Sequence, residues 1–239
     1  MQLKATARTL IALLAAGSLA TAQADPHKPA PQEKPAKPAA AQEAGAKTDA
    51  PMMLQFGVMG LTKDNESKVK ESLTALTAQR YVCEPCKVDK AMAGKCPKCS
   101  GDLAMKKKPV IQSSQAMTDK ESLSLTVAPG ASLSYSELES ALGKNSVKID
   151  AGKFTIPGKA ELILRGGTAE NATAIQKSLD DAKLFEHVKA NFDAAKSEIV
   201  VMVQAGATPP TRAKVASTID SAGTKLQLSD VIIGAAPKS

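Results

Sequence analysis

Two Cys-x-x-Cys pairs constrain this chain more than any other feature. The pairs span Cys83–Cys86 and Cys96–Cys99, nine residues separate them, and the 239-residue chain has no other cysteine. Two such pairs at this separation can bring four sulfur atoms onto one tetrahedral metal ion, and the usual ion is zinc. The candidate metal ligands are therefore Cys83, Cys86, Cys96 and Cys99.

Each cysteine pair has the composition of a tight turn, which we call a knuckle. Pro85 and Pro97 lie within the two knuckles and favour such turns. Gly94 and Gly101 lie close to the second knuckle and permit unusual backbone angles. We expect both knuckles to turn tightly, so that their sulfur atoms point toward a common centre.

Disulfide bonds are the alternative interpretation of these cysteines. An oxidising compartment favours disulfides, and cross-paired bridges between the knuckles fit the spacing. A thioredoxin-like redox centre is a further alternative, but the strand–turn–helix setting that such a centre needs is not visible in the sequence. The preferred cofactor is zinc, with copper or another soft heavy metal as the alternative.

The positive charge of the chain is concentrated around the knuckles. The formal net charge is +7, and residues 80–108 carry eight basic and three acidic groups. Four thiolates on a divalent ion leave a negative centre, which nearby lysines can offset. These lysines are Lys87, Lys90, Lys95 and Lys98. A solvated basic face is the alternative, and we expect no nucleic-acid partner because Tyr81 is the only aromatic residue nearby.

The N-terminal residues have the composition of an export signal. Lys4 and Arg8 precede a short apolar stretch, and Ala22-Gln23-Ala24 fits the cleavage pattern. Residues 1–24 are thus expected to be a signal peptide, and the mature protein to be periplasmic or secreted without a membrane span. Residues 25–50 are rich in Pro, Ala and Lys and are predicted to be a disordered linker, in which His27 is no ligand.

Beyond the linker, strand and helix patterns alternate, which predicts an α+β fold. In the second half, a Gly166-Gly167 turn follows an apolar strand, Thr168 is a helix cap, and Thr208-Pro209-Pro210 is expected to begin a second helix. The remaining strands are expected at 188–192, 198–203 and 226–233. This order, β-α-β-β-α-β, is that of a ferredoxin-like sandwich.

The first half repeats the same layout less regularly. Strands are expected at 53–60, 122–127 and 146–150, with helices at 65–77 and 134–142, the latter opened by a capping box at Ser134. We therefore predict two ferredoxin-like modules. One covers 51–155 and carries a zinc-ribbon-like insert at 80–108, and the second covers 156–239 as an independent unit.

The knuckle segment resembles the short heavy-metal-binding domain of bacterial metal-efflux proteins. The similarity spans about 23 residues and lies in Tyr81–Cys86 at the start and Gly94–Leu103 at the end of that span. The family pattern is roughly Tyr-x-Cys-Pro-Met-His-Pro followed by Pro-Gly-x-Cys-Pro-x-Cys-Gly-Met-x-Leu. Cys86 replaces the histidine of the family, and Ser100-Gly101 replaces its Gly-Met. Both departures favour closed zinc coordination over copper handling.

The two flanking modules look like heavy-metal-associated domains, the ferredoxin-like fold of copper chaperones. Gly60-Leu61-Thr62 and Gly166-Gly167-Thr168 resemble the start of the metal loop of that family. The two loop cysteines of the family would fall at Lys63 and Glu66, and at Ala169 and Ala172. The resemblance therefore implies modules that keep the fold and have lost the metal ligands.

No catalytic constellation accompanies these features, so we expect a protein that is not an enzyme. The irregularly spaced methionines are interpreted as core residues and His187 as a surface residue. The leading hypothesis is an exported metal-binding protein, in metal handling or resistance, with an envelope protein as its other partner. The alternatives are an interaction adaptor with a structural zinc ribbon and a thiol redox protein.

Overall fold

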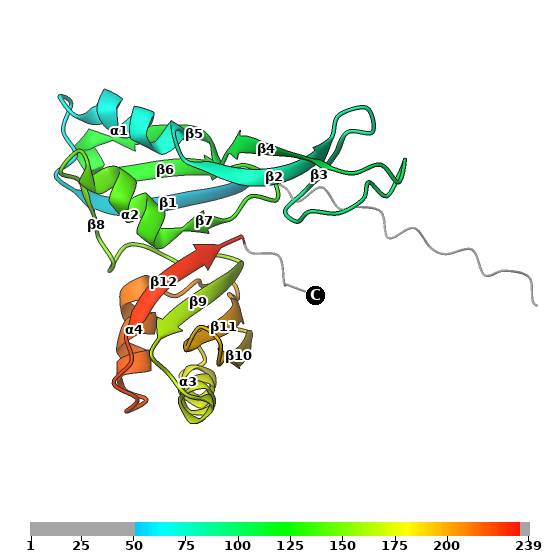
Figure 1. The fold of residues 1–239 in the computed structure, drawn as a ribbon. Coiled ribbons are helices and arrows are strands. Elements are labelled where there is room, and N and C mark those ends of the chain that lie inside the picture. The colour runs from blue at the N-terminus through cyan, green and yellow to red at the C-terminus, as the bar shows by residue number, and fades with distance from the viewer. Residues whose placement is uncertain (1–50, 235–239) are drawn as a thin grey trace, which may run out of the picture. The chain divides into compact units, whose positions relative to one another are not determined.

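The computed structural model describes residues 51–234 (Figure 1). The predicted signal peptide at 1–24 and the predicted linker at 25–50 with His27 lie outside these residues. The described chain is a mixed fold of helices and antiparallel strands in three sheets, as the α+β prediction required.

The first half of the chain builds a four-stranded sheet in the order β5-β6-β1-β8. Its strands are β1 (Met52–Met59), β5 (Ile111–Met117), β6 (Ser122–Val127) and β8 (Lys148–Ile149), and its helices are α1 (Glu66–Thr74) and α2 (Tyr135–Gly143). A single turn of 3₁₀ helix, Thr118–Lys120, joins β5 to β6. Alternate residues of β1 and β6 are buried because one face of the sheet packs on the helices.

The four strands of the second half and β7 from the first half form a five-stranded sheet in the order β10-β11-β9-β12-β7. Its strands are β9 (Lys159–Arg165), β10 (His187–Asp193), β11 (Glu198–Gln204), β12 (Leu228–Ile233) and the two-residue β7 (Leu133–Ser134), and its helices are α3 (Ala169–Asp181) and α4 (Arg212–Asp220). The buried stripe of α3 is Ala172, Ile175 and Leu179, spaced as an amphipathic helix requires.

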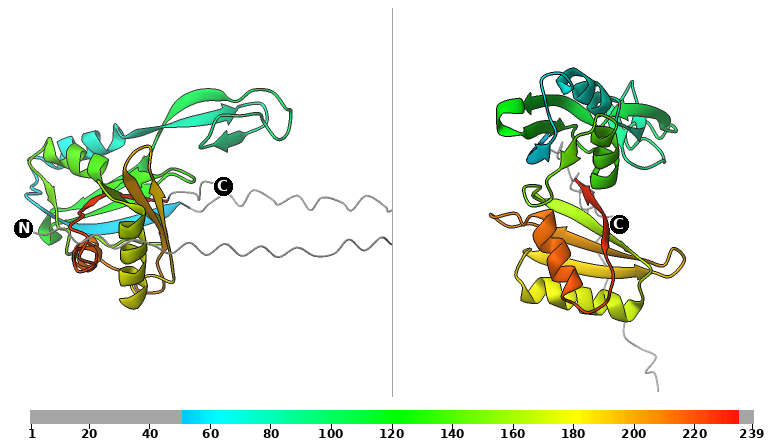
Figure 2. Two further views of the ribbon diagram at one scale, coloured as in Figure 1. Left: turned by 60° about the horizontal axis from the view of Figure 1, so that its bottom comes forward. Right: turned by 90° about the vertical axis from the view of Figure 1, so that its left-hand side faces the viewer.

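The third sheet is a three-stranded ribbon in the order β3-β2-β4. Its strands are β2 (Thr77–Cys83), β3 (Val88–Lys90) and β4 (Ala104–Pro109). The ribbon leaves the four-stranded sheet after α1 and returns to it at β5 (Figures 1 and 2). The cysteine segment is therefore inserted between the first helix and the later strands, although its strands reach beyond residues 80–108.

The two larger sheets have the same connectivity once the ribbon and β7 are set aside. Strand, helix, two strands, helix and strand follow one another as β1-α1-β5-β6-α2-β8 and as β9-α3-β10-β11-α4-β12. In each sheet the first strand of the set lies between the third and the fourth, and the second strand forms one edge.

A shared turn reinforces this internal repeat. Gly60 and Gly166 both have a positive φ, of 82° and 77°, at the end of the first strand. The backbone N–H of Glu66 donates to Thr62 and that of Ala172 to Thr168, each over 3.1 Å. The predicted cap at Thr168 is confirmed, because its side chain accepts from the N–H of Asn171 in a reciprocal capping box.

The buried residues of both halves form one continuous hydrophobic cluster. Phe154, fully buried in the connection between the sheets, contacts Phe56 and Tyr135 with ring centroids 5.3 Å and 4.9 Å away. β7 precedes α2 in the chain and pairs with β12 through Leu133↔Ile233. We call this pairing of β7 with β12 the seam. A side-chain hydrogen bond strengthens it, because the Asp230 carboxylate accepts from the Ser134 hydroxyl over 2.7 Å.

The predicted start of the last helix at Thr208-Pro209-Pro210 is wrong. The cap is Thr211, whose hydroxyl accepts from the N–H of Lys214 over 3.3 Å, and α4 begins at Arg212. A residue that precedes proline avoids the helical region, which disfavours a helix that begins at Pro209, directly before Pro210. The Pro210 carbonyl accepts instead from the N–H of Ile156 over 2.9 Å.

Candidate metal centre

The knuckles lie at the two connections of the ribbon. Cys83 is the last residue of β2, and the first knuckle links β2 to β3. The second knuckle lies between β3 and β4, where an isolated bridge between Lys95 and Asp102 closes its base. Within it the N–H of Cys96 donates to Gly101 and the N–H of Ser100 donates to Cys96, both over 2.8 Å.

The same backbone geometry recurs in both knuckles. Lys87 and Ser100 directly follow the second cysteine of their knuckles and have φ values of 52° and 57°. This left-handed conformation reverses the chain after each pair and favours glycine. The expected role of Gly101 is therefore wrong: the left-handed position is one residue earlier, at Ser100, and a second one is at Lys87. Gly94 has a φ of 153°.

All four sulfur atoms lie within 4.8 Å of one another. Those of Cys83 and Cys99 are 3.6 Å apart, and the four thiols are free. Metal–sulfur bonds of about 2.3 Å place the corners of a tetrahedron about 3.8 Å apart. A disulfide would require about 2.05 Å. The arrangement therefore matches a four-thiolate metal site, and the four predicted ligands are brought together in one cluster.

Burial differs among the four ligands. Cys96 is 2% exposed, and Val82 and Leu103 of the same segment are also buried. Cys83 and Cys86 are half-buried, whereas Cys99 is exposed. One side of the cluster is thus closed by the ribbon and the other is open to solvent.

The sulfur atoms of Cys96 and Cys86 differ in their affinity for protons. Burial acts to raise the pKa of Cys96, but the backbone N–H groups of Cys99 and Lys98 donate to its sulfur and lower the pKa to about 6. Contacts with the sulfurs of Cys99 and Cys83 raise the pKa of Cys86 to about 12. Four adjacent thiols cannot all ionise together without a cation, and a divalent ion would supply the missing charge.

Ion pairs between strands hold the ribbon around this cluster. Lys108 on β4 contacts the Asp89 carboxylate on β3 over 2.6 Å, and Lys106 on β4 contacts Glu84 in the first knuckle. Of the four lysines expected to offset the thiolate charge, Lys98 joins the knuckles directly, because its ammonium donates to the Cys86 carbonyl over 3.1 Å.

The degenerate loops at 63–66 and 169–172 contain no thiol, as the sequence shows, and their polar groups are engaged in helix starts. Asn65 Oδ1 accepts from the N–H of Thr62 over 2.8 Å, and Asn171 Oδ1 accepts from that of Thr168 over 3.1 Å. His187 is exposed at the start of β10, as predicted.

The interpretation of the methionines as core residues covered Met52, Met53, Met59, Met92, Met105 and Met117, and it is wrong for four of these six. Four are among the most exposed apolar side chains of the described residues: Met53, Met59, Met92 and Met105. The core is filled instead by Leu, Ile, Val and three of the phenylalanines. An unbranched thioether is tolerated at the surface, and irregular spacing alone gave no basis for burial.

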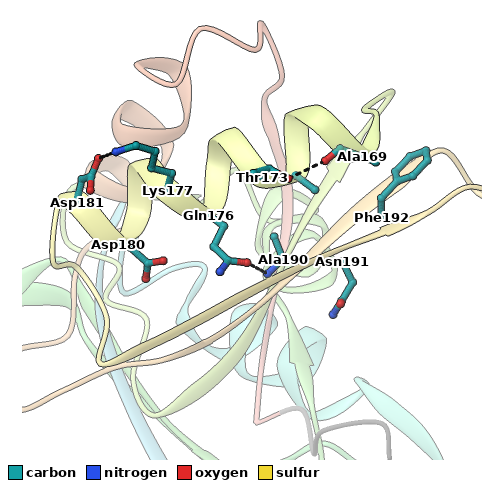
Figure 3. Close-up of a pocket in the computed structure, with 10 residues that line it drawn as sticks. Ala169, Thr173, Gln176, Lys177, Asp180, Asp181, Ala190, Asn191 and Phe192 are labelled. Atoms are coloured by element: carbon teal, nitrogen blue, oxygen red, sulfur yellow. Dashed lines mark hydrogen bonds and ion pairs between the residues drawn. The ribbon is translucent and has the colours of Figure 1, made fainter. Parts of the chain in front are cut away.

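A groove lies between α3 and the edge strand β10 of the second sheet (Figure 3). Gln176 on α3 spans it and accepts from the backbone N–H of Ala190 over 3.0 Å. Lys177 pairs with Asp181 on the same helix over 2.5 Å. We assign no chemistry to this groove.

Among residues 51–234, no helix combines the length and apolar character needed to cross a membrane. Comparison of the chain with protein-family models, with curated proteins and with solved structures found no match.

Proposed function

We propose that the chain is an exported, non-enzymatic protein that binds one zinc ion through Cys83, Cys86, Cys96 and Cys99. The observation that carries this proposal is the convergence of the four sulfur atoms within 4.8 Å from two knuckles of like geometry. An all-sulfur set without histidine favours zinc over the harder divalent ions, and copper(I) is the main competitor.

The ferredoxin-like assignment of the two modules belongs to this proposal. It is supported by the common strand order of the two larger sheets and by the shared Gly-x-Thr-x-x-Asn turn. The modules lack metal ligands in that turn, so we infer that they position the ribbon and present surfaces to an envelope partner. The resemblance to the heavy-metal-binding domain of metal-efflux proteins points in the same direction.

Exposure of the site favours metal handling over a purely structural role. Cys99 is open to solvent, so an acceptor thiolate can approach the ion from that side. A purely structural ribbon, the second candidate, is supported by the closed four-sulfur set and by the buried Cys96. The two candidates differ in the rate at which bound zinc exchanges with a chelator.

Elemental analysis of protein purified from its own compartment tests the proposal. We expect one zinc per chain and four thiols that react after denaturation in a chelator. Exchange with isotopically labelled zinc then separates a handling site, complete within minutes, from a structural site, which exchanges over days. Protein without metal and without reactive thiols would mean disulfides and would reject the proposal. N-terminal sequencing should give Asp25.

A further inference from the structure

Arg80 connects the ribbon to the body of the protein. It lies on β2 and is 8% exposed, although it carries a charge. Its Nε donates to Asp89 on β3 over 2.7 Å, and its Nη1 donates to the carbonyl of Gly130. A buried guanidinium needs such partners because isolated charge is costly away from water. One side chain therefore depends on two separate segments.

The first of these segments depends on the knuckles. Asp89 belongs to β3, which has three residues and lies between the two cysteine pairs. Val88 is half-buried, and Asp89 and Lys90 are exposed, so β3 has little apolar packing of its own. Metal binding supplies the folding free energy of such small ribbons. The position of the Asp89 carboxylate therefore depends on the metal.

The second segment leads to the seam where β7, from the first half of the chain, pairs with β12 of the second half. Gly130 has a φ of 66°, and a Cβ there would lie 2.9 Å from Nη2 of Arg80. The turn of residues 128–131 runs directly into β7, which pairs with β12. A Cβ at Gly234, after β12, would lie 2.9 Å from the carbonyl oxygen of Ala131. The turn is thus confined between Arg80 and the end of β12.

We propose that Arg80 couples metal occupancy of the ribbon to the pairing of β7 with β12. With the ion bound, β3 holds Asp89 against Arg80, and Arg80 holds the turn at Gly130. Without the ion, the carboxylate leaves, and a buried guanidinium without its anion is strongly disfavoured. Arg80 then turns to solvent, and the turn that leads to β7 loses the hydrogen bond from Arg80 to Gly130. This inference rests on the proposed zinc site and adds that zinc occupancy regulates the pairing of β7 with β12.

Such coupling must be reciprocal, which gives a test without removing any ligand. Gly130→Ala displaces Arg80 and should weaken zinc binding by about 5-fold or more in a chelator competition. Gly223→Ala is the matched control. Gly223 has a φ of 72°, and nothing lies within 4 Å of a Cβ there. Gly223→Ala therefore introduces the same kind of backbone strain as Gly130→Ala but displaces no neighbouring side chain. Equal affinities of the two variants would overturn the inference.

Hydrogen exchange on zinc-loaded and zinc-stripped full-length chains completes the test. Metal removal should raise exchange at 77–109 and also at 128–134 and 228–233. Arg80→Met keeps the apolar stem of the side chain and should still bind one zinc. In this variant, exchange at 128–134 and 228–233 should no longer differ between the zinc-loaded and the zinc-stripped chain. A change confined to 77–109, or one spread evenly over 51–234, would overturn the coupling and leave the zinc site standing. A chain that binds no zinc would reject both.

Discussion

The sulfur atoms of Cys83 and Cys99 lie 3.6 Å apart, although one ends a strand and the other lies in the opposite knuckle. This contact brings the first knuckle and the second knuckle together at the candidate metal site. The other two sulfur atoms of the cluster differ in burial, because Cys96 is buried and Cys86 is half-buried. Replacing one ligand should therefore reduce the zinc affinity by an amount that depends on which cysteine is replaced.

Cys99→Ser and Cys96→Ser should not be equivalent. At the exposed position water can take the fourth coordination site, as it does in open zinc sites, so Cys99→Ser should retain weakened binding. At the buried position the ribbon interior excludes water, so Cys96→Ser should lose zinc to the limit of detection. Competition with a chromophoric chelator measures both affinities. Equal losses would show that burial does not distinguish the ligands.

Ser100→Gly should stabilise the protein. Ser100 has a φ of 57°, and a side chain in this region costs up to about 1 kcal/mol that glycine does not incur. We expect the free energy of unfolding of the zinc-loaded chain, from urea titration, to rise by roughly this amount. Ser113→Gly in β5, a strand position, should instead lower it by about 0.5–1 kcal/mol. A loss at Ser100 would show that its hydroxyl has a role.

The features that the sequence predicted correctly are those with strong local signals. The four cysteines are the only ones in the chain, so their spacing needed no tertiary information. Alternation of buried and half-buried residues along β11 and the apolar stripe of α3 follow directly from the periods of strand and helix. The cap at Thr168 has a mechanism that acts within three residues.

The features that escaped prediction depend on tertiary contacts. β5 is an edge strand with a largely polar face, so Ile111–Met117 shows no alternation. β7 has two residues and exists because Leu133 pairs with Ile233, a hundred positions later in the chain. Arg80 looked like one more basic residue of the ribbon, and only the fold brings Gly130 to it. The hydrophobic periodicity of a segment carries no information about contacts with residues that are distant in the sequence.

Asn65→Ala and Asn171→Ala test the internal repeat. Both amides accept from the threonine N–H three residues earlier, so each loss should cost about 1 kcal/mol. Asn65 also donates to the Gly60 carbonyl over 2.9 Å and to the Asn145 carbonyl over 3.3 Å. Asn65→Ala should therefore cost more, up to about 2 kcal/mol. Urea titration compares the two, and the reverse order would contradict the assigned contacts.

Tyr135 should make stability depend on alkaline pH. Its ring is 3% exposed, and the Arg212 guanidinium carbon lies 4.1 Å above its centroid. Burial raises the pKa of the Tyr135 phenol and outweighs the opposite effect of Arg212.

The folded pKa of Tyr135 thus exceeds the unfolded value of about 10, and its neutral form favours the fold. The associated stability is complete below about pH 10 and is lost as the pH rises above it. Urea midpoints of the wild type should fall more steeply between about pH 9 and about pH 11 than those of Tyr135→Phe. If Tyr135→Phe shows the same slope as the wild type, the phenol ionises equally well in the folded and unfolded chain.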